Sequence, residues 1–264
     1  MNQWTPDPRS LVGMVHLSAL PGTPACRGSV PDMMSRAVEE TRTLISAGFD
    51  AILVENMHDV PYLRRTVGSE IVAAMSVAVG AVVEAAGKAP VGVQVLAGAN
   101  REAVSIAHAT GARFIRAEGF AYAAVADEGL LEEADAGPLL RHRRAIGAED
   151  VSIWADVRKK HSAHAITSDL VLADMVAGHE FMGADAVIIT GSHTGQAVSV
   201  HDLEAAGQAG DLPVVVGSGA TAESLPALLD HADAVIVGSA LKKRGHWANE
   251  LDEERIRAFV EARG

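Results

Sequence analysis

Acidic and histidine side chains stand at the ends of short apolar runs in this sequence. Asp156 closes the run VSIWAD, Glu55 closes AILVE, and His16 closes LVGMVH. Such groups accept or donate a proton near neutral pH when burial or a neighbouring charge shifts their pKa. We therefore predict that Asp156 is the principal catalytic residue and that Glu55 and His16 assist it.

The segment after Asp156 is strongly basic. It reads RKKHS and places Lys159, Lys160 and His161 close to that carboxylate in the chain. Burial would raise the pKa of Asp156 and these cations would lower it, a balance typical of a proton-transfer group. Lys160 and His161 join the predicted catalytic set, although the sequence does not show which of Lys159 and Lys160 faces the pocket. A Schiff-base lysine, a solvated lysine and a structural salt bridge to Asp156 stay open as alternatives.

Two glycine turns late in the sequence are typical of a phosphate site. One follows the apolar run 214–216, and the other follows the run 234–237. Backbone N–H groups in such turns, together with a helix N-terminus, bind anions. Lys242 and Lys243 come soon after the second turn and favour the same interpretation, whereas the alternative is that the glycines only tighten the connections. The predicted phosphate-binding residues are Gly217, Ser218, Gly219, Gly238 and Ser239.

Other polar residues near the strand ends are predicted to contact a substrate. Asn100 has a second interpretation as the cap of the helix that follows it. Arg116 also has a second interpretation, in which it forms a structural ion pair with Glu55 across neighbouring strands. The turn TGSHTG offers hydroxyl groups and a flexible backbone that suit closure over a ligand. The predicted substrate-binding residues are Asn56, Asn100, Arg116, Glu118, Thr190 and Thr194.

A divalent metal ion held by His16, Glu55 and Asp156 is a further alternative. The sequence contains no closely spaced ligand motif such as H-x-x-x-H to support it. We therefore predict no metal and no other cofactor, and a small anionic, phosphorylated ligand as the binding partner.

The elements that position these residues alternate regularly along the chain. Short β-branched apolar runs predict strands with both faces buried, and amphipathic stretches between them predict helices. This alternation predicts an α/β fold with a single (β/α)8 TIM barrel over residues 1–264, in which the carboxyl ends of the strands meet at one mouth. The predicted strands are 11–17, 50–54, 91–96, 114–117, 151–157, 186–189, 214–216 and 234–237.

Three connections carry specific expectations. The acidic stretch 121–137 is predicted to be a long loop. Thr221 is predicted to cap a helix that ends at Leu229. Thr167 or Ser168 is predicted to cap another helix, which would bury one apolar face. The residues expected on that face are Leu170, Val171, Met175 and Phe181.

The composition limits the class of protein. The 264 residues carry a formal net charge of −12, which argues against binding a nucleic-acid backbone over a broad surface. The single cysteine, Cys26, rules out an intrachain disulfide and fits a reducing, cytoplasmic compartment. The polar N-terminus lacks the apolar core of a signal peptide.

The most membrane-like stretch is 71–83, which reads IVAAMSVAVGAVV. It is too short to span a bilayer, so we predict that the protein does not span a membrane. The stretch is apolar almost all round and is expected to form a helix covered on both sides. We therefore predict a homo-oligomer in which another subunit covers the outer side of this helix.

Five motifs together resemble one protein family. The stretches GMVHLSALPGTP, VENMHD, ADVRKKHS, TGSHTG and VGSG…ADAVIVGSALK resemble the BtpA/SgcQ family almost from end to end. That family is similar to the ribulose-phosphate-binding barrels and is named for photosystem I biogenesis. One departure is Ser18-Ala19, where the family pattern has a proline-rich turn. The pocket that the resemblance implies consists of His16, Glu55, Asn56, Asp156, Lys160, His161, Thr190, Gly217, Gly219, Gly238 and Ser239.

These observations favour an enzyme that acts on a small phosphorylated sugar, or on a phosphoribosyl or nucleoside-type substrate, by general acid–base chemistry. Isomerisation, carbon–carbon cleavage and glycosidic cleavage all fit such a site. The alternative from another class is a non-catalytic biogenesis or assembly factor that binds a partner through its surface. Metal-assisted hydrolysis of nucleosides or similar glycosides is the third hypothesis.

Overall fold

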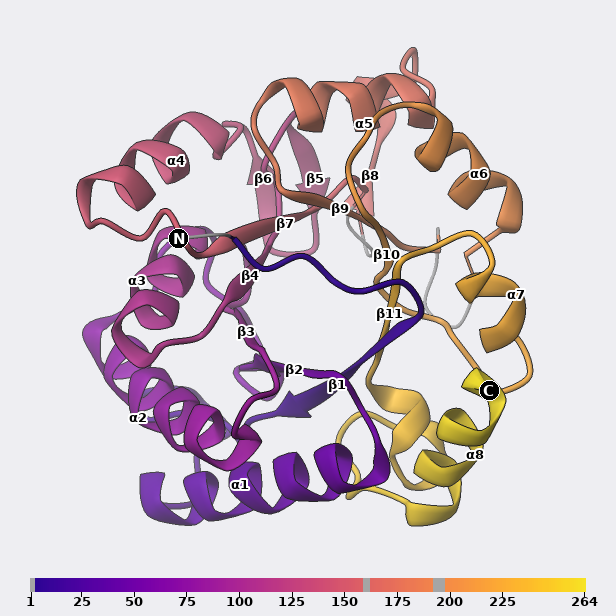
Figure 1. Cartoon of the computed structure of the whole chain (residues 1–264). Helices are drawn as coiled ribbons and strands as arrows, with labels where there is room; N and C mark the ends of the chain where they lie inside the picture. The colour runs from indigo at the N-terminus through magenta and orange to yellow at the C-terminus, as the bar shows by residue number, and fades with distance from the viewer. Residues whose placement is uncertain (1–2, 159–161, 192–197) are drawn as a thin grey trace.

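The computed structural model describes residues 3–158, 162–191 and 198–264. Within them, eight parallel strands close into a barrel in the order β1-β11-β10-β9-β7-β4-β3-β2, and helices surround it (Figure 1). The predicted α/β barrel is therefore confirmed. The barrel strands are β1 (Ser10–His16), β2 (Ala51–Glu55), β3 (Val91–Gln94), β4 (Phe114–Ala117), β7 (Ser152–Asp156), β9 (Ala186–Ile189), β10 (Val214–Val216) and β11 (Ala234–Val237).

The outer helices begin and end at residues with clear capping roles. The Ser29 side chain accepts a hydrogen bond from the N–H of Asp32 and begins α1, and Gly48 ends it with a left-handed φ of 109°. Asp252 caps the last helix by accepting from the N–H groups of Glu254 and Arg255. The helices are α1 (Val30–Ala47), α2 (Ser69–Ala86), α3 (Asn100–Thr110), α4 (Ala136–Ala145), α5 (Leu172–Phe181), α6 (Val200–Gln208), α7 (Leu225–Leu229) and α8 (Glu253–Arg263).

The strands divide the apolar residues into two layers because successive side chains point to opposite faces. In β1, Leu11 and Val15 pack in the layer between strands and helices. Val12 and Met14 point into the barrel instead, where they join a separate interior cluster. The same alternation holds in every barrel strand. It determines which polar residues at the carboxyl ends of the strands point into the barrel mouth.

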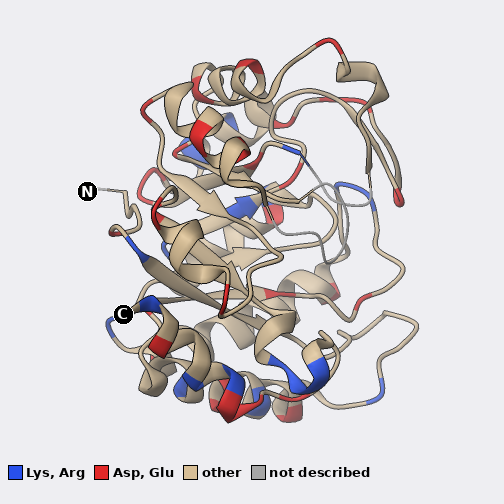
Figure 2. Ribbon diagram, turned by 90° about the vertical axis from the view of Figure 1, so that its right-hand side faces the viewer, with Lys and Arg blue, Asp and Glu red and all other residues tan. Residues whose placement is uncertain are grey.

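Aromatic rings fill the amino-terminal end of the barrel. Phe114 and Trp154 stack inside it with ring centroids 4.1 Å apart, and Trp4 stacks on Trp154 at 5.2 Å. The Ser152 hydroxyl donates to the Trp4 carbonyl oxygen at 2.6 Å, which fixes the segment before β1 across this opening. Figure 2 shows both chain ends at this end of the barrel and the longer connections at the other. The barrel is therefore closed at its amino-terminal end.

The acidic stretch 121–137 is not the loop that its composition predicted. It contains a hairpin of β5 (Ala124–Ala126) and β6 (Gly129–Leu131), and β8 (Ser162–Ala163) pairs with the other edge of β5. Gly129 takes a φ of 114° in the hairpin, a left-handed value that favours glycine. Two connections on the same end of the barrel are thus joined into one small antiparallel sheet.

The helix after β7 begins later than predicted. Thr167 lies in a short 3-10 turn, η1 (Ala165–Thr167), and α5 starts only at Leu172 with Val171 as its N-cap. Val171 is 61% exposed and Phe181 is 89% exposed, so the predicted apolar face was wrong at these two positions. Met175 is buried as expected. The predicted face differs because the residues around Thr167 form a 3-10 turn instead of the first turn of the helix.

The helices beside the late glycine turns are also shorter than predicted. Thr221 and Ser224 exchange hydrogen bonds in a turn, and α7 begins at Leu225. After β11 the chain forms two short 3-10 turns, η2 (Ser239–Leu241) and η3 (Lys243–Gly245), instead of a helix start. The anion site predicted here therefore depends on the turns themselves.

The apolar helix α2 is longer than the stretch that predicted it. By length and composition it could cross a bilayer, but in the structure it packs between α1 and α3 and buries Ile71, Met75 and Val79 against the barrel. This is the position of an ordinary barrel helix, which agrees with the prediction that it does not span a membrane. Val77, on its outer face, is 49% exposed. Coverage of that face by a second subunit stays a prediction, as does a cytoplasmic location.

Candidate active site

The polar residues of the barrel mouth continue the inward rows of the strands. Met14 on β1 and Leu53 on β2 point into the barrel. His16 and Glu55 follow them by two residues and therefore point to the same side. On β4, Arg116 likewise follows the inward residue Phe114 by two positions. The residues at the equivalent position of the other barrel strands complete a ring around the mouth. The residues of this ring are His16, Glu55, Gln94, Arg116, Asp156, Thr190, Gly217 and Gly238. We call it the polar ring; it lies at the carboxyl ends of the strands, where barrel active sites form.

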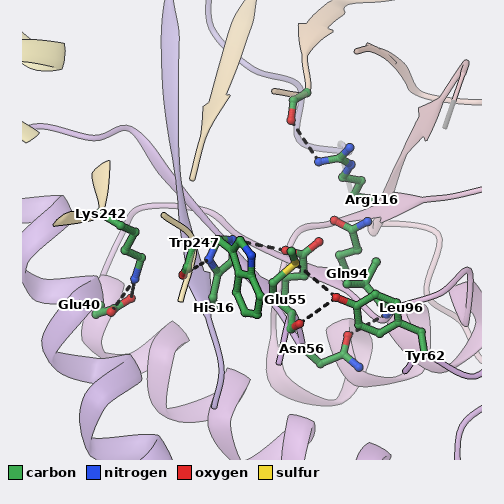
Figure 3. A network of polar contacts seen from close by, with 12 residues as sticks. His16, Glu40, Glu55, Asn56, Tyr62, Gln94, Leu96, Arg116, Lys242 and Trp247 are labelled. Atoms are coloured by element: carbon green, nitrogen blue, oxygen red, sulfur yellow. Dashed lines mark hydrogen bonds and ion pairs between the residues drawn. The ribbon is translucent and has the colours of Figure 1, made fainter. Parts of the chain in front are cut away.

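His16 and Glu55 face each other across β1 and β2, which pair in register at these residues. The His16 Nε2 atom lies 3.4 Å from Glu55 Oε2, and the two side chains are 5% and 9% exposed. The other ring nitrogen, Nδ1, lies 3.3 Å from the carbonyl oxygen of Trp247 (Figure 3). Both nitrogens of this imidazole therefore face hydrogen-bond acceptors.

Burial keeps the imidazole neutral. It lowers the pKa of His16 from its ordinary 6.5 to about 3, and the nearby Lys242 ammonium lowers it further in the same direction. A neutral imidazole carries one N–H, so only one of its two acceptors can receive a proton from it. The His16–Glu55 pair thus has a position for one additional proton between Nε2 and Oε2.

Arg116 and Asp156 form a second pair on the opposite side of the ring. The Nε and Nη2 atoms of Arg116 donate to the two carboxylate oxygens of Asp156, each at 2.9 Å. The neighbouring carboxylate raises the pKa of Arg116 although burial opposes the charge. Arg116 Nη1 also donates to the carbonyl oxygen of Gly217 at 3.3 Å (Figure 3). The suggested ion pair of Arg116 with Glu55 is replaced by this bidentate pair with Asp156.

The carboxylate of Asp156 is therefore occupied in this structure. Both of its oxygens accept from Arg116, an arrangement that fixes the position of the guanidinium. Asp156 does lie in the polar ring, as predicted, but its contacts are those of a residue that positions Arg116. Its catalytic role stays a prediction.

Asn56 holds two loops of the mouth together. Its Nδ2 atom donates to Asp59 at 2.8 Å. Its Oδ1 atom accepts from the N–H of Leu96 at 2.7 Å (Figure 3). Asp59 in turn accepts from the N–H of Leu20, and burial raises the pKa of this carboxyl. Both ends of the Asn56 amide are thus used within the protein, so substrate binding by Asn56 stays a prediction.

Asn100 does not cap its helix. Ala99 occupies the N-cap position of α3, while Asn100 Nδ2 donates to the Glu118 carbonyl oxygen at 2.9 Å and to Asp135 at 2.8 Å. Its Oδ1 atom accepts from the N–H of Glu118 at 3.2 Å. Asn100 therefore fixes the chain after β4, and Glu118 is held 5% exposed beside the mouth.

Thr190 follows β9 and turns its hydroxyl toward the neighbouring connection, donating to the Arg158 carbonyl oxygen at 2.8 Å. It thus links the connections after β7 and β9. The predicted residues Lys160, His161 and Thr194 lie outside the described residues, as does Lys159.

The first late glycine turn is shaped by close packing. A Cβ atom at Gly217 would lie 2.5 Å from Ile188 Cγ2 and 2.7 Å from Thr190 Cγ2, so no larger residue fits. The Gly217 N–H donates to the Ile189 carbonyl oxygen within the sheet and is not directed at a ligand. Gly219, with φ of 80°, turns the chain away from the strand.

The second late turn lies directly against His16. A Cβ atom at Gly238 would lie 3.3 Å from both Nε2 and Cε1 of that imidazole. The lysines that follow do not support a phosphate site. Lys242 is buried with both Glu40 carboxylate oxygens on its Nζ atom at 2.6 and 2.7 Å, and Lys243 pairs with Glu250 at the surface. The inference drawn from these two lysines was wrong because both ammonium groups already have carboxylate partners.

One residue of the polar ring was missed from sequence. Gln94 ends β3, is 2% exposed, and lies between Glu55 and Arg116 in the ring (Figure 3). Two positions earlier, Gly92 leaves room for the Phe114 ring inside the barrel, so Gln94 belongs to the inward row. The signal in the sequence was a single amide in an otherwise apolar strand. Gln94 lies two residues after Gly92, so the two residues share the inward face of the strand.

The described residues contain no group of three or more histidine, cysteine or acidic side chains arranged to hold a metal ion. Of the three residues suggested as metal ligands, His16 and Glu55 lie together, whereas Asp156 is paired with Arg116. The prediction of no metal remains a prediction.

Comparisons with known proteins place this geometry in a family. The model of the BtpA family matches residues 7–263. An uncharacterised mitochondrial protein of Caenorhabditis elegans is 41% identical over 252 residues, which cover 94% of this chain and 90% of that protein. The photosystem I biogenesis protein BtpA of a Synechocystis strain is 36% identical over 253 residues, which cover 96% of this chain and 87% of that protein.

A solved structure of 3-hexulose-6-phosphate synthase has the same fold. The two structures superpose with a TM-score of 0.57 at 16% sequence identity, over 96% of this chain and 99% of the other. The shared feature is the barrel, whose strands carry the polar ring described above. Since the family model spans nearly the whole sequence and relatives match it from end to end, the chain belongs to the BtpA family.

Proposed function

We propose that this barrel is an enzyme that acts on a small phosphorylated sugar or phosphoribosyl compound by proton transfer. The fold resembles that of phosphosugar-processing barrels, of which 3-hexulose-6-phosphate synthase is one by name. The observation that carries the proposal is the buried His16–Glu55 pair, in which a neutral imidazole faces a carboxylate and can share an additional proton with it.

In this proposal Glu55 takes a proton from the substrate and His16 supports it. Proton transfer by a positioned side chain is most effective where burial keeps water away and a second group shares the charge. The change from Asp156 to Glu55 as principal base rests on the contacts, because both Asp156 oxygens are held by Arg116. Three of the five Arg116 N–H groups bind Asp156 and Gly217, and the others are suited to polarise a substrate oxygen.

The phosphate would bind at the turns after β10 and β11. Hydrogen bonds among the described residues leave the N–H groups of Gly219, Ser239 and Ala240 unused. The Ser218 hydroxyl is buried and likewise has no hydrogen-bond partner in the described part of the chain. Gly238 touches His16, so an anion held here would lie next to the acid–base pair.

Ligand-induced stabilisation tests the phosphate site. Ribose 5-phosphate, ribulose 5-phosphate and inorganic phosphate should each raise the melting temperature, because a ligand that binds only the folded state stabilises it. Gly219→Ala should abolish this response by forcing a side chain on a residue whose φ is 80°. Gly111→Ala is the matched control, since Gly111 has the same φ at the end of α3, far from the mouth. No response from the wild type, or equal responses from the two variants, would reject the site.

A second experiment tests the chemistry. Products formed from the phosphosugar that binds are followed by NMR for the wild type and for Glu55→Gln. The variant should retain phosphate binding and lose about 10²- to 10⁴-fold in rate, the usual contribution of a positioned base. If the variant turns over the compound at the wild-type rate, Glu55 is not the base. The assembly-factor alternative would gain support only if the wild type bound no compound of the set.

A further inference from the structure

Gln94 occupies a position in the polar ring that no part of the proposed function has used. It pairs in register with Glu55 on the neighbouring strand and is 2% exposed. Its side chain points into the mouth between Glu55 and Arg116 (Figure 3). A buried amide at this place has both a donor end and an acceptor end to satisfy.

The donor end is directed by an acidic neighbour. Gln94 Nε2 lies 3.4 Å from Glu118 Oε1, and a carboxylate oxygen accepts hydrogen bonds from an amide NH2 group. This contact fixes which way the amide is turned. The carbonyl oxygen, Oε1, is then left buried without a hydrogen-bond partner among the described residues.

The neighbouring buried amides are satisfied at both ends. Asn56 uses its donor on Asp59 and its acceptor on Leu96, and Asn100 likewise donates and accepts on both sides of its amide. Burying an acceptor without a partner destabilises a folded protein, so such groups are few and mark a function where they occur. Gln94 is therefore the amide of the mouth whose acceptor is available to a ligand.

We propose that Gln94 determines substrate specificity by accepting a hydrogen bond, through Oε1, from a hydroxyl group on the carbon chain of the phosphorylated substrate. This inference rests on the proposed function and adds to it the class of compound: a polyhydroxylated one, with a hydroxyl near the carbon that Glu55 approaches. A substrate without that hydroxyl leaves the carbonyl unpaired, which is the strongest means a site has of rejecting it.

The first experiment requires no ligand. Gln94→Met keeps the shape of the side chain and removes both the unpartnered acceptor and the long 3.4 Å contact to Glu118. Since these two effects oppose each other, the melting temperature should change little. Asn56→Leu is the matched control: it removes an amide with two engaged ends from the neighbouring connection and should lower the melting temperature by several degrees. A fall for Gln94→Met as large as that for Asn56→Leu would overturn the inference, because it would show that the protein itself uses the Gln94 carbonyl.

The second experiment measures binding by calorimetry. Inorganic phosphate is compared with the tightest binder among ribose 5-phosphate, ribulose 5-phosphate and fructose 6-phosphate, for the wild type and for Gln94→Met. The variant should bind the sugar phosphate ~10- to 100-fold more weakly and phosphate unchanged, because one hydrogen bond to a buried acceptor is lost. Equal weakening of both ligands, or no change in either, overturns the role of Gln94 alone. Failure of every ligand to bind the wild type overturns the proposed function and this inference together.

Discussion

Two buried pairs face each other in the polar ring, and they differ in what they can do. Arg116 and Asp156 meet through two parallel contacts of 2.9 Å, whereas His16 and Glu55 meet through one of 3.4 Å. The arginine is always charged, so in the first pair it does not exchange a proton near neutral pH. In the second pair an imidazole nitrogen faces a carboxylate oxygen, and an additional proton can lie on either of these two atoms. The rigid pair suits positioning and the looser pair suits proton transfer.

This difference shows why residue type alone did not identify the base. Asp156 and Glu55 are both carboxylates at the ends of buried strands, and both lie in the ring. Their described partners differ in kind, since a bidentate guanidinium binds both oxygens of Asp156 whereas the imidazole of His16 lies against Glu55. Three experiments test the comparison.

The largest effect is expected from breaking the rigid pair. Arg116→Met should lower the free energy of unfolding by about 3–5 kcal/mol, because it leaves Asp156 buried without its cation. Urea unfolding followed by circular dichroism measures the change. The double variant Arg116→Met with Asp156→Leu serves as control and should recover part of the loss, since no buried charge remains. A loss below about 1 kcal/mol in the single variant would mean that the pair is solvated and contributes little.

An intermediate effect should distinguish the glycines beside the two pairs. Gly217→Ala should cost about 1–3 kcal/mol in unfolding free energy, because its Cβ would overlap Ile188 and Thr190. Gly238→Ala should cost less, since its Cβ would meet only Met14 and His16, at 3.2 to 3.3 Å, and would move the imidazole. NMR of the His16 ring should then show a changed pKa for Gly238→Ala. Equal stabilities and an unchanged His16 resonance would show that the second turn does not touch the pair.

The pH dependence of stability should identify the pair that titrates. Burial lowers the pKa of His16 from 6.5 to about 3, so between these values the unfolded chain binds a proton that the folded chain does not. Unfolding free energy should therefore be complete above pH 6.5 and fall as pH decreases toward 3, by up to about 1.4 kcal/mol for each pH unit. His16→Gln should flatten this slope in urea titrations. Parallel curves for the two proteins would mean that Glu55 holds His16 in its charged form instead.

The fold could be predicted because the pattern of strands is local. Each barrel strand carries a short β-branched run whose identity does not depend on distant residues, and the runs 114–117, 186–189, 214–216 and 234–237 were predicted with the bounds observed. Residues at the strand ends were placed correctly in the ring for the same reason. His16, Glu55, Arg116 and Asp156 follow from counting along strands.

Partners could not be predicted because they depend on contacts between distant segments. Lys242 pairs with Glu40 on α1, and the hairpin within 121–137 pairs with Ser162–Ala163 after β7. Neither contact leaves a local pattern in the sequence. Gln94 was not predicted because it is an uncharged amide at the end of an apolar strand, where the residue type alone does not indicate chemistry.

The tryptophan stack at the closed end of the barrel has a consequence for how the molecule assembles. Trp4 packs on Phe114 of β4 and on Trp154 of β7, which both lie near the middle of the chain. Because contacts between distant segments form more slowly than local ones, a change in Trp4 indole emission during refolding should follow helix formation and report when this segment docks on the barrel.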